Sequence, residues 1–350
     1  MPYVSSPVRP VGFEVWSPED GMLPAQVVLP TPAGPAALRR PLVEANRAWL
    51  TRMGVCRPGD RTSRALDLAS FEDLAALVFR DDTEEHLLLA TQLLTIVYLL
   101  DDQVDSPRSP VGSDPHAGRA VCDAVLAALA GQLNAMALVP PAVRSPAVRA
   151  LIRAFSDVGR RLAALPGDRD PFLEAIAVWL DGVAAECAGR ASSPVADLAA
   201  YAELRLGAGG VVPFFELGCL LRDLAVSPRA RRDAQLDRLL RSAGLAAAYA
   251  NDLVSAGKDG LEGETANLVL VIERVEGARR DQAIARACAL HNEVVDEVVD
   301  ARVRLARRGD PALDAWVDFI IGSMWGHLEW LHRVTARYAG AEEPSLRQVS

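Results

Sequence analysis

Apolar residues recur every three to four positions along most of this chain, which is the period of an amphipathic helix. Val294, Val295, Val298 and Val299 fall on one face of such a helix, and acidic residues occupy the other face. Ala, Leu, Arg and Glu dominate from Pro41 onward, and all four favour helices. No segment shows the alternation typical of a β-strand. The pattern therefore predicts an all-α fold, with helices packed around a common core.

Prolines and glycines mark where the predicted helices end. Eight prolines fall in the first 40 residues, which we interpret as an extended lead-in to the helical body. Later breakers, such as those at 106–110, 140–141 and 309–311, divide the remainder into ten to twelve predicted helices. We expect residues 41–340 to form a single α-helical domain and residues 341–350 to form a tail.

Composition narrows the class of protein. The 350 residues carry a net charge of -9, so a broad basic surface for nucleic acid or an anionic membrane is not expected. The longest apolar run, 87–100, is interrupted by Thr and Gln, and is too short for a membrane span. Residues 1–9 lack a secretory signal pattern, and the five cysteines are scattered. These features predict a cytoplasmic protein without disulfide bonds.

The first candidate for chemistry is an acidic helix end, Asp101-Asp102-Gln103-Val104-Asp105, after a long apolar stretch. Carboxylates at a helix C-terminus are unfavourable unless a cation compensates them, because that end already carries partial negative charge. Asp101 and Asp105 are four residues apart and share a face. Oxygen ligands of this kind suit Mg²⁺, although a solvated acidic helix end is the plain alternative.

A second acidic cluster, residues 81–85, precedes an apolar run instead of following one. Acidic residues are favourable at a helix N-terminus. We interpret this cluster as a helix start, with Asp82 as the capping residue and Glu85 three positions later.

The second candidate for chemistry is a polar stripe on an apolar helix. Asn251, Ser255 and Asp259 recur every four residues, and their oxygens are again ligands that suit Mg²⁺. Lys258, the only lysine in the chain, lies in the same segment, and a compact ammonium group suits a phosphate oxygen. The alternative is a helix end with a turn, which Gly257 and Gly260 would favour.

Taken together, the two candidates resemble the metal motifs of the bacterial class I terpene synthases. The segments Glu262-Gly263-Glu264 and Asn267-Leu268-Val269 resemble the residues that follow the second motif in that family. The segment from Met324 to Trp330, followed by Thr335-Ala336-Arg337-Tyr338, resembles its closing element. Arg205 lies 46 residues before Asn251, where the family places a diphosphate-sensing arginine, and Gly209 matches the helix-break glycine behind the sensor.

The resemblance implies an α-helical bundle around an apolar cavity, and a cyclase that ionises a linear prenyl diphosphate, farnesyl or geranylgeranyl diphosphate. It also implies three Mg²⁺ ions as cofactor. Two of the ions would be held by Asp101 with Asp102 and Asp105, and the third by Asn251, Ser255 and Asp259. The diphosphate would contact Arg205, Asn251, Lys258, Arg337 and Tyr338. Catalysis would also use Gly209, and the cavity wall would include Phe71, Tyr98, Phe214, Phe215, Trp325 and Trp330.

The sequence departs from the family pattern at three points, one of which is that Val97 and Tyr98, before the Asp-rich motif, are less aromatic than usual. The acid of the second motif is Asp259, where glutamate is usual, and Ala208 stands between the sensor and the break glycine, where a polar residue is more common. Two other functions therefore stay open: a trans-prenyltransferase, whose second Asp-rich motif is missing here, and a non-catalytic helical protein that keeps the fold. The resemblance leaves open the substrate length, the product skeleton, and whether the protein is a monomer or a homodimer.

Overall fold

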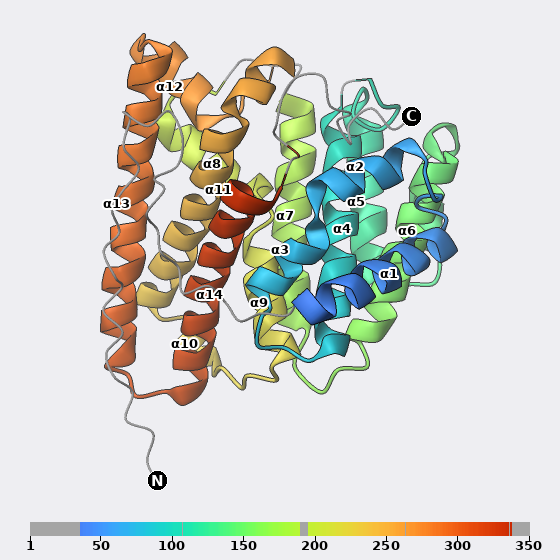
Figure 1. Cartoon of the computed structure of the whole chain (residues 1–350), viewed down its shortest axis with the longest axis horizontal. Coiled ribbons are helices and arrows are strands. Elements are labelled where there is room, and N and C mark those ends of the chain that lie inside the picture. Colours follow the sequence, from blue (N-terminus) through green and yellow to red (C-terminus); the bar gives the residue numbers. More distant parts are fainter. Residues whose placement is uncertain (1–35, 107, 190–194, 263, 336, 338–350) are drawn as a thin grey trace.

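The computed structural model describes residues 36–106, 108–189, 195–262, 264–335 and 337. These residues form helices and connecting loops without any strand, which confirms the predicted all-α fold (Figure 1). Fourteen α-helices lie within them, more than the ten to twelve predicted, because several are only four to nine residues long. The proline-rich lead-in and the tail lie almost wholly outside the described residues.

The helix bounds follow the chain order. The first seven α-helices are α1 (Ala36–Met53), α2 (Arg61–Ala69), α3 (Phe71–Val78), α4 (Glu84–Asp105), α5 (Pro115–Leu129), α6 (Pro146–Leu162) and α7 (Asp170–Gly189). The others are α8 (Leu198–Ala208), α9 (Val212–Leu221), α10 (Pro228–Arg231), α11 (Ala234–Glu262), α12 (Leu268–Glu276), α13 (Arg280–Ala306) and α14 (Pro311–Glu329). Short 3-10 turns η2 (Ala135–Leu138) and η3 (Pro141–Val143) follow α5, and a π-helical turn η4 (Trp330–Val334) extends α14.

Side-chain caps begin many of these helices. The start of α4 shows one correction, because its N-cap is Thr83, whose hydroxyl accepts a hydrogen bond from the His86 amide. Asp82, which the sequence suggested as the cap, is buried and lies 2.6 Å from an Arg222 nitrogen in an ion pair. The acidic cluster was therefore correctly placed at a helix start, but the capping residue was off by one position.

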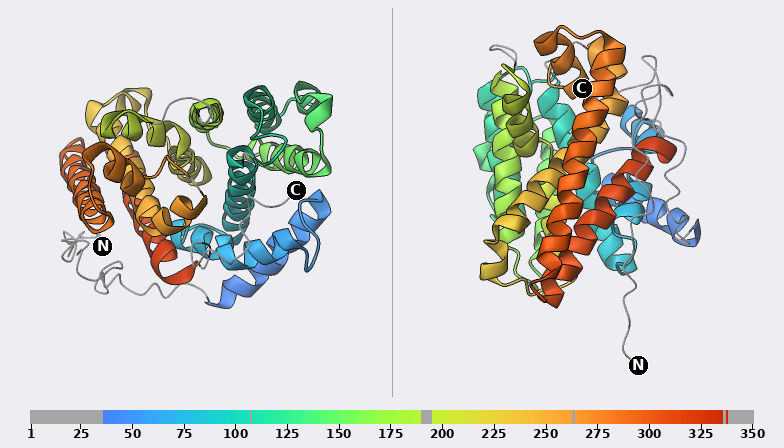
Figure 2. Two further views of the ribbon diagram at one scale, coloured as in Figure 1. Left: turned by 90° about the horizontal axis from the view of Figure 1, so that it is seen from above. Right: turned by 90° about the vertical axis from the view of Figure 1, so that its left-hand side faces the viewer.

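The helices form two groups that meet along α4, α7 and α3. Helices α11, α13 and α14 lie on one side, and α1, α5 and α6 lie on the other (Figures 1 and 2). Helix α11 packs along α13, and α14 packs against α3. Aliphatic side chains of nearly every helix fill the main core, and a smaller core joins α8, α11, α12 and α13.

Two helical stretches, 84–104 and 198–221, are long and apolar enough for a membrane span by composition alone. The first is α4, and 83% of its most apolar window is buried inside the protein. The second is not one helix, because the chain breaks between α8 and α9. Gly210 has a positive φ of 67° at this break, a conformation that glycine adopts without strain.

Candidate active site

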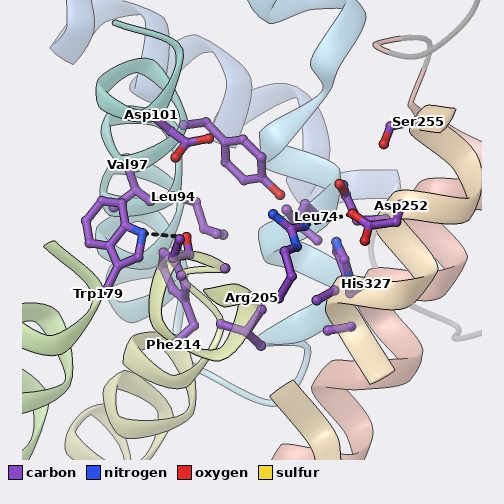
Figure 3. Close-up of a pocket in the computed structure, with 18 of the residues that line it drawn as sticks. Leu74, Leu94, Val97, Asp101, Trp179, Arg205, Phe214, Asp252, Ser255 and His327 are labelled. Carbon is purple, nitrogen blue, oxygen red and sulfur yellow. Dashed lines mark hydrogen bonds and ion pairs between the residues drawn. The ribbon is translucent and has the colours of Figure 1, made fainter. Parts of the chain in front are cut away.

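A cavity opens between α3, α4, α7, α11, α14 and the break between α8 and α9 (Figure 3). It gathers most of the residues that the sequence singled out from four distant segments. The predicted polar residues on its wall are Asp101, Arg205, Asn251, Ser255, Lys258, Asp259 and Arg337. The predicted nonpolar and aromatic residues on its wall are Tyr98, Gly209, Phe214 and Phe215.

The two acidic motifs face this cavity from different helices. Asp101 lies near the C-terminal end of α4, and Ser255 lies on α11 across the cavity, while Phe214 lies toward the other end (Figure 3). Helical spacing of four residues places Asn251, Ser255 and Asp259 on one face of α11, as predicted. The cavity therefore has a polar end and an apolar end.

The polar stripe on α11 is held together by hydrogen bonds. The Ser255 hydroxyl donates to Asp259 Oδ2 at 2.6 Å. The Asn267 side-chain amide donates to the same Asp259 oxygen at 3.0 Å and lies 3.2 Å from Ser255 Oγ. Asn267 also accepts a hydrogen bond from the Val269 amide as the N-cap of α12, so its position is fixed from both sides. The shorter acid at Asp259 is thus held in a defined position.

Asp252, next to Asn251, joins this network to the arginine of α8. One of its oxygens lies 3.0 Å from Arg205 Nη2, and the other accepts a hydrogen bond from the Leu268 amide at 3.0 Å. The carboxyl group is buried, which raises its pKa well above the usual value. The nearby carboxylates of Asp259, Glu186 and Glu264 raise this pKa further. Arg205, the predicted sensor, is therefore held beside the second motif.

The charges on the cavity wall fit divalent cations. Five carboxylates line it (Asp101, Glu186, Asp252, Asp259 and Glu264), against three cationic side chains (Arg205, Lys258 and Arg337). Within the described residues no group of three His, Cys, Asp or Glu is placed to hold a metal. The donors on α11 are instead an amide oxygen, a hydroxyl and a carboxylate, all of which are hard oxygen ligands that Mg²⁺ accepts.

Asp102 lies in a different environment from its neighbour Asp101. It does not line the cavity, is 1% exposed, and forms a bidentate ion pair with Arg337, with N–O distances of 2.7 and 3.3 Å. The Arg337 guanidinium also lies 5.4 Å from the centre of the Tyr98 ring. Asp102 is predicted as a metal ligand, and its ion pair with Arg337 joins it to a residue that is predicted to contact the diphosphate.

The break between α8 and α9 is built by backbone contacts. A side chain at Gly209 would place its Cβ 2.5 Å from the Arg205 carbonyl oxygen, so only glycine fits. Ala208 has no polar side chain, but its carbonyl oxygen accepts a hydrogen bond from Trp179 Nε1 at 3.2 Å. Trp179 on α7 thus supports the break at the position where the family more often has a polar side chain.

The predicted aromatic wall divides into two layers. Tyr98, Phe214 and Phe215 line the cavity, but Phe71, Trp325 and Trp330 do not. Phe71 stacks behind Tyr98 with ring centres 4.5 Å apart, and Trp330 lies 6.1 Å from both rings. The Trp330 indole donates to the Ala69 carbonyl at 2.9 Å. Phe71 and Trp330 therefore support the wall and do not form its surface.

Some predicted site residues cannot be placed. The side chain of Asp105 and the whole of Tyr338 lie outside the described residues. The structure also adds residues to the site that sequence reasoning missed: Trp179, Glu186, Asp252, Asn267 and His327. Asp252 and Asn267 belong to segments that resemble the family, but the sequence analysis assigned neither residue a function. Trp179 and Glu186 lie on α7, in a segment without any motif.

Comparison with known proteins agrees with this geometry. A sequence model of "Terpene synthase family 2, C-terminal metal binding" matches residues 92–297. Pentalenene synthase of Streptomyces avermitilis is 27% identical over 300 residues, which cover 82% of this chain and 84% of that protein. The (+)-T-muurolol synthase ((2E,6E)-farnesyl diphosphate cyclizing) of Roseiflexus castenholzii is 28% identical over 262 residues, 74% of this chain and 76% of that protein.

A solved structure shows the same architecture. The linalool/nerolidol synthase of Streptomyces clavuligerus, in complex with 2-fluorogeranyl diphosphate, superposes with a TM-score of 0.71. The two chains are 25% identical, and the match covers 84% of this chain and 98% of the other.

Proposed function

The chain belongs to terpene synthase family 2, and from this premise we propose that it ionises a linear prenyl diphosphate and cyclises the resulting carbocation. The observation that carries the proposal is the cavity itself. Asp101 on α4 and the stripe of Asn251, Ser255 and Asp259 on α11 line one cavity whose far end is apolar. A charged leaving group and an apolar chain could each find a matching surface there.

The polar end supplies groups for the diphosphate. Arg205, Lys258 and Arg337 line the cavity with the acidic motifs, and a guanidinium group can hold two phosphate oxygens at once. Bound Mg²⁺, for which Asp101, Asn251, Ser255 and Asp259 are the proposed ligands, would neutralise negative charge that develops on the leaving diphosphate. We propose three ions, as the family resemblance implies. Lys258 and Arg337 would hold the free diphosphate away from the carbocation.

The apolar end controls the fate of the cation. Phe214, Phe215 and Leu94 line it, and they would exclude water that would otherwise quench the reaction. Tyr98, which stacks on Phe71 and lies near the Arg337 guanidinium, is the proposed aromatic wall residue between this end and the polar end. The wall would therefore favour ring closure over capture by water.

Farnesyl diphosphate is the substrate we favour, because the T-muurolol synthase relative cyclises that substrate. Geranylgeranyl diphosphate is the longer alternative. We place the enzyme in the cytoplasm, acting on a small molecule as a monomer or a homodimer, without nucleic acid or membrane as a partner.

Replacing Asn251 by Ala tests the proposal against a non-catalytic protein of the same fold. Wild-type protein with Mg²⁺ and farnesyl diphosphate should release diphosphate, and an EDTA control should not. Asn251→Ala should remain folded by circular dichroism and lose nearly all release, because the amide oxygen ligand is gone. Wild-type protein that releases no diphosphate from C10, C15 or C20 substrates would contradict the proposed function.

A further inference from the structure

His327 is a polar side chain in the cavity wall. It is neither a proposed metal ligand nor a proposed diphosphate contact. It lies on α14 and lines the cavity, and Figure 3 shows it on the opposite side from Asp101. Its Nδ1 is enclosed and has no hydrogen-bond partner among the described residues. Nε2 likewise makes no hydrogen bond with a described residue. A buried polar atom without a partner destabilises a fold, so each such atom calls for an explanation.

The ring is held in place by packing. It stacks on Trp330, with ring centres 5.8 Å apart and an angle of 22° between the planes. Trp330 is fully buried and anchored through its indole hydrogen bond to Ala69. The imidazole is therefore oriented on the cavity wall by packing against Trp330.

The other polar group that α14 brings to this wall is less suited to take a proton. Ser323 lines the cavity, but its hydroxyl donates to the Ile320 carbonyl at 2.7 Å. An alcohol oxygen is also a weaker base than a neutral imidazole. Met324, between the two, offers a thioether that is a poor proton acceptor.

On the basis of the proposed function, we propose that His327 is the base that ends the reaction by removing a proton from the final carbocation. A C–H bond on the carbon next to the cationic centre breaks, and its electron pair forms the C=C bond of the product. The proton joins the lone pair of the unprotonated ring nitrogen, and the ring becomes an imidazolium. No oxidant or further reactant is required.

The environment of the ring suits this role. Burial lowers the pKa of His327 to about 4, so the ring is neutral near pH 7 and does not repel an approaching carbocation. Such a ring is a weak base, but the C–H bond beside a cationic carbon is acidic enough for a weak base to suffice. The same low pKa returns the proton to water when the product leaves, which restores the neutral ring.

The test compares His327→Ala with Met324→Ala, a control that removes a side chain of similar size from the same wall. Diphosphate release and the products in the organic extract are measured for each. We expect His327→Ala to release diphosphate at about the rate of the control. The wild-type olefin, per diphosphate released, should fall by about 100-fold, with alcohols or other olefins in its place. Added imidazole should restore the olefin in His327→Ala and leave Met324→Ala unchanged.

An unchanged product profile in His327→Ala, or a changed profile that imidazole does not restore, would overturn the proposal. If His327→Ala does not fold, His327→Phe keeps an aromatic ring against Trp330 and is measured in the same way. Loss of the olefin in His327→Phe supports the proposal, and the wild-type profile overturns it. Failure of the proposed function is seen separately, because wild-type protein would then release no diphosphate.

Discussion

The two acidic faces of the cavity are built in different ways. On α11, Ser255 and Asp259 are tied to each other and to Asn267, which begins the next helix. On α4, Asp102 forms an ion pair with Arg337, 235 residues away, and among the described side chains of this motif its neighbour Asp101 faces the cavity. The α11 face is held by contacts between residues at most about 16 positions apart in the sequence. The α4 face is held by a contact with Arg337, at the C-terminal end of the described chain.

This difference suggests how the two faces function. The α11 face is arranged before any ligand binds, because buried hydrogen bonds fix its donors. The α4 face couples a motif residue to a predicted diphosphate ligand, so the position of Arg337 depends on Asp102. Residues that are adjacent in a motif therefore need not share a role, and the following variants test that separation.

The largest expected effect separates the neighbours Asp101 and Asp102. Asp101→Asn should lower kcat by about 1,000-fold, because loss of a metal ligand removes several kcal/mol of stabilisation of the leaving diphosphate. Asp102→Asn should instead lower activity less and raise the KM for the prenyl diphosphate, because Arg337 loses its charged partner. Steady-state diphosphate release measures both variants. Equal losses of kcat in the two variants would show that both residues bind metal.

The next effect concerns the hydrogen bonds by which Asn267 positions Ser255 and Asp259 on α11. Asn267→Ala should weaken Mg²⁺ binding by about 10–100-fold, since second-layer hydrogen bonds orient the metal ligands. Asn267→Ser is the matched control, because it keeps an N-cap acceptor for the Val269 amide without adding charge, and its side chain lacks the amide that donates to Asp259. The stabilisation of the protein against heat by Mg²⁺ and diphosphate is the readout. If Asn267→Ser binds Mg²⁺ as tightly as wild type, the hydrogen bond to Asp259 does not orient the metal ligands.

A smaller effect tests the support of the helix break. Trp179→Phe removes the hydrogen bond to the Ala208 carbonyl and keeps most of the ring volume. We expect a loss of about 1 kcal/mol in the free energy of unfolding, together with a measurable fall in kcat. Urea unfolding and diphosphate release provide the two readouts. A variant with wild-type stability and activity would show that the break needs no such support.

The last prediction concerns the pH dependence of stability, and it uses a buried histidine that lies outside the cavity. Burial lowers the pKa of His291, on α13, to about 4 from an ordinary 6.5. Between these values the unfolded chain binds the proton and the folded chain does not, so stability falls as pH falls from about 6.5 toward 4. At pH 5.5 this amounts to about 1 kcal/mol.

His291→Gln should therefore lose less stability than wild type between pH 7.5 and 5.5, by that amount. Asp252, with its raised pKa, acts in the opposite direction, so the difference between the two proteins is the quantity to measure. Urea unfolding at both pH values checks it. Identical pH dependence in the two proteins would contradict the lowered pKa.

Features that depend on residues close in the sequence were predicted correctly, and contacts between distant segments were not. Helical spacing alone placed Asn251, Ser255 and Asp259 on one face, and the resemblance identified Arg205 as a diphosphate-sensing residue. The Asp102–Arg337 pair and the Trp179–Ala208 hydrogen bond could not be predicted, because each joins segments whose approach only the fold decides. The layering of the aromatic residues could not be predicted either. Composition does not show that Phe71 and Trp330 lie behind Tyr98 and not beside it.

The central claim is that this cavity converts a linear prenyl diphosphate into a cyclic terpene. Incubation with Mg²⁺ and, separately, the C10, C15 and C20 diphosphates, followed by gas chromatography and mass spectrometry of the organic extract, tests it directly. We predict a cyclic product from the C15 substrate that is absent with EDTA and absent with Asn251→Ala. Only linear alcohols, at the level of the EDTA control for every substrate, would contradict the account.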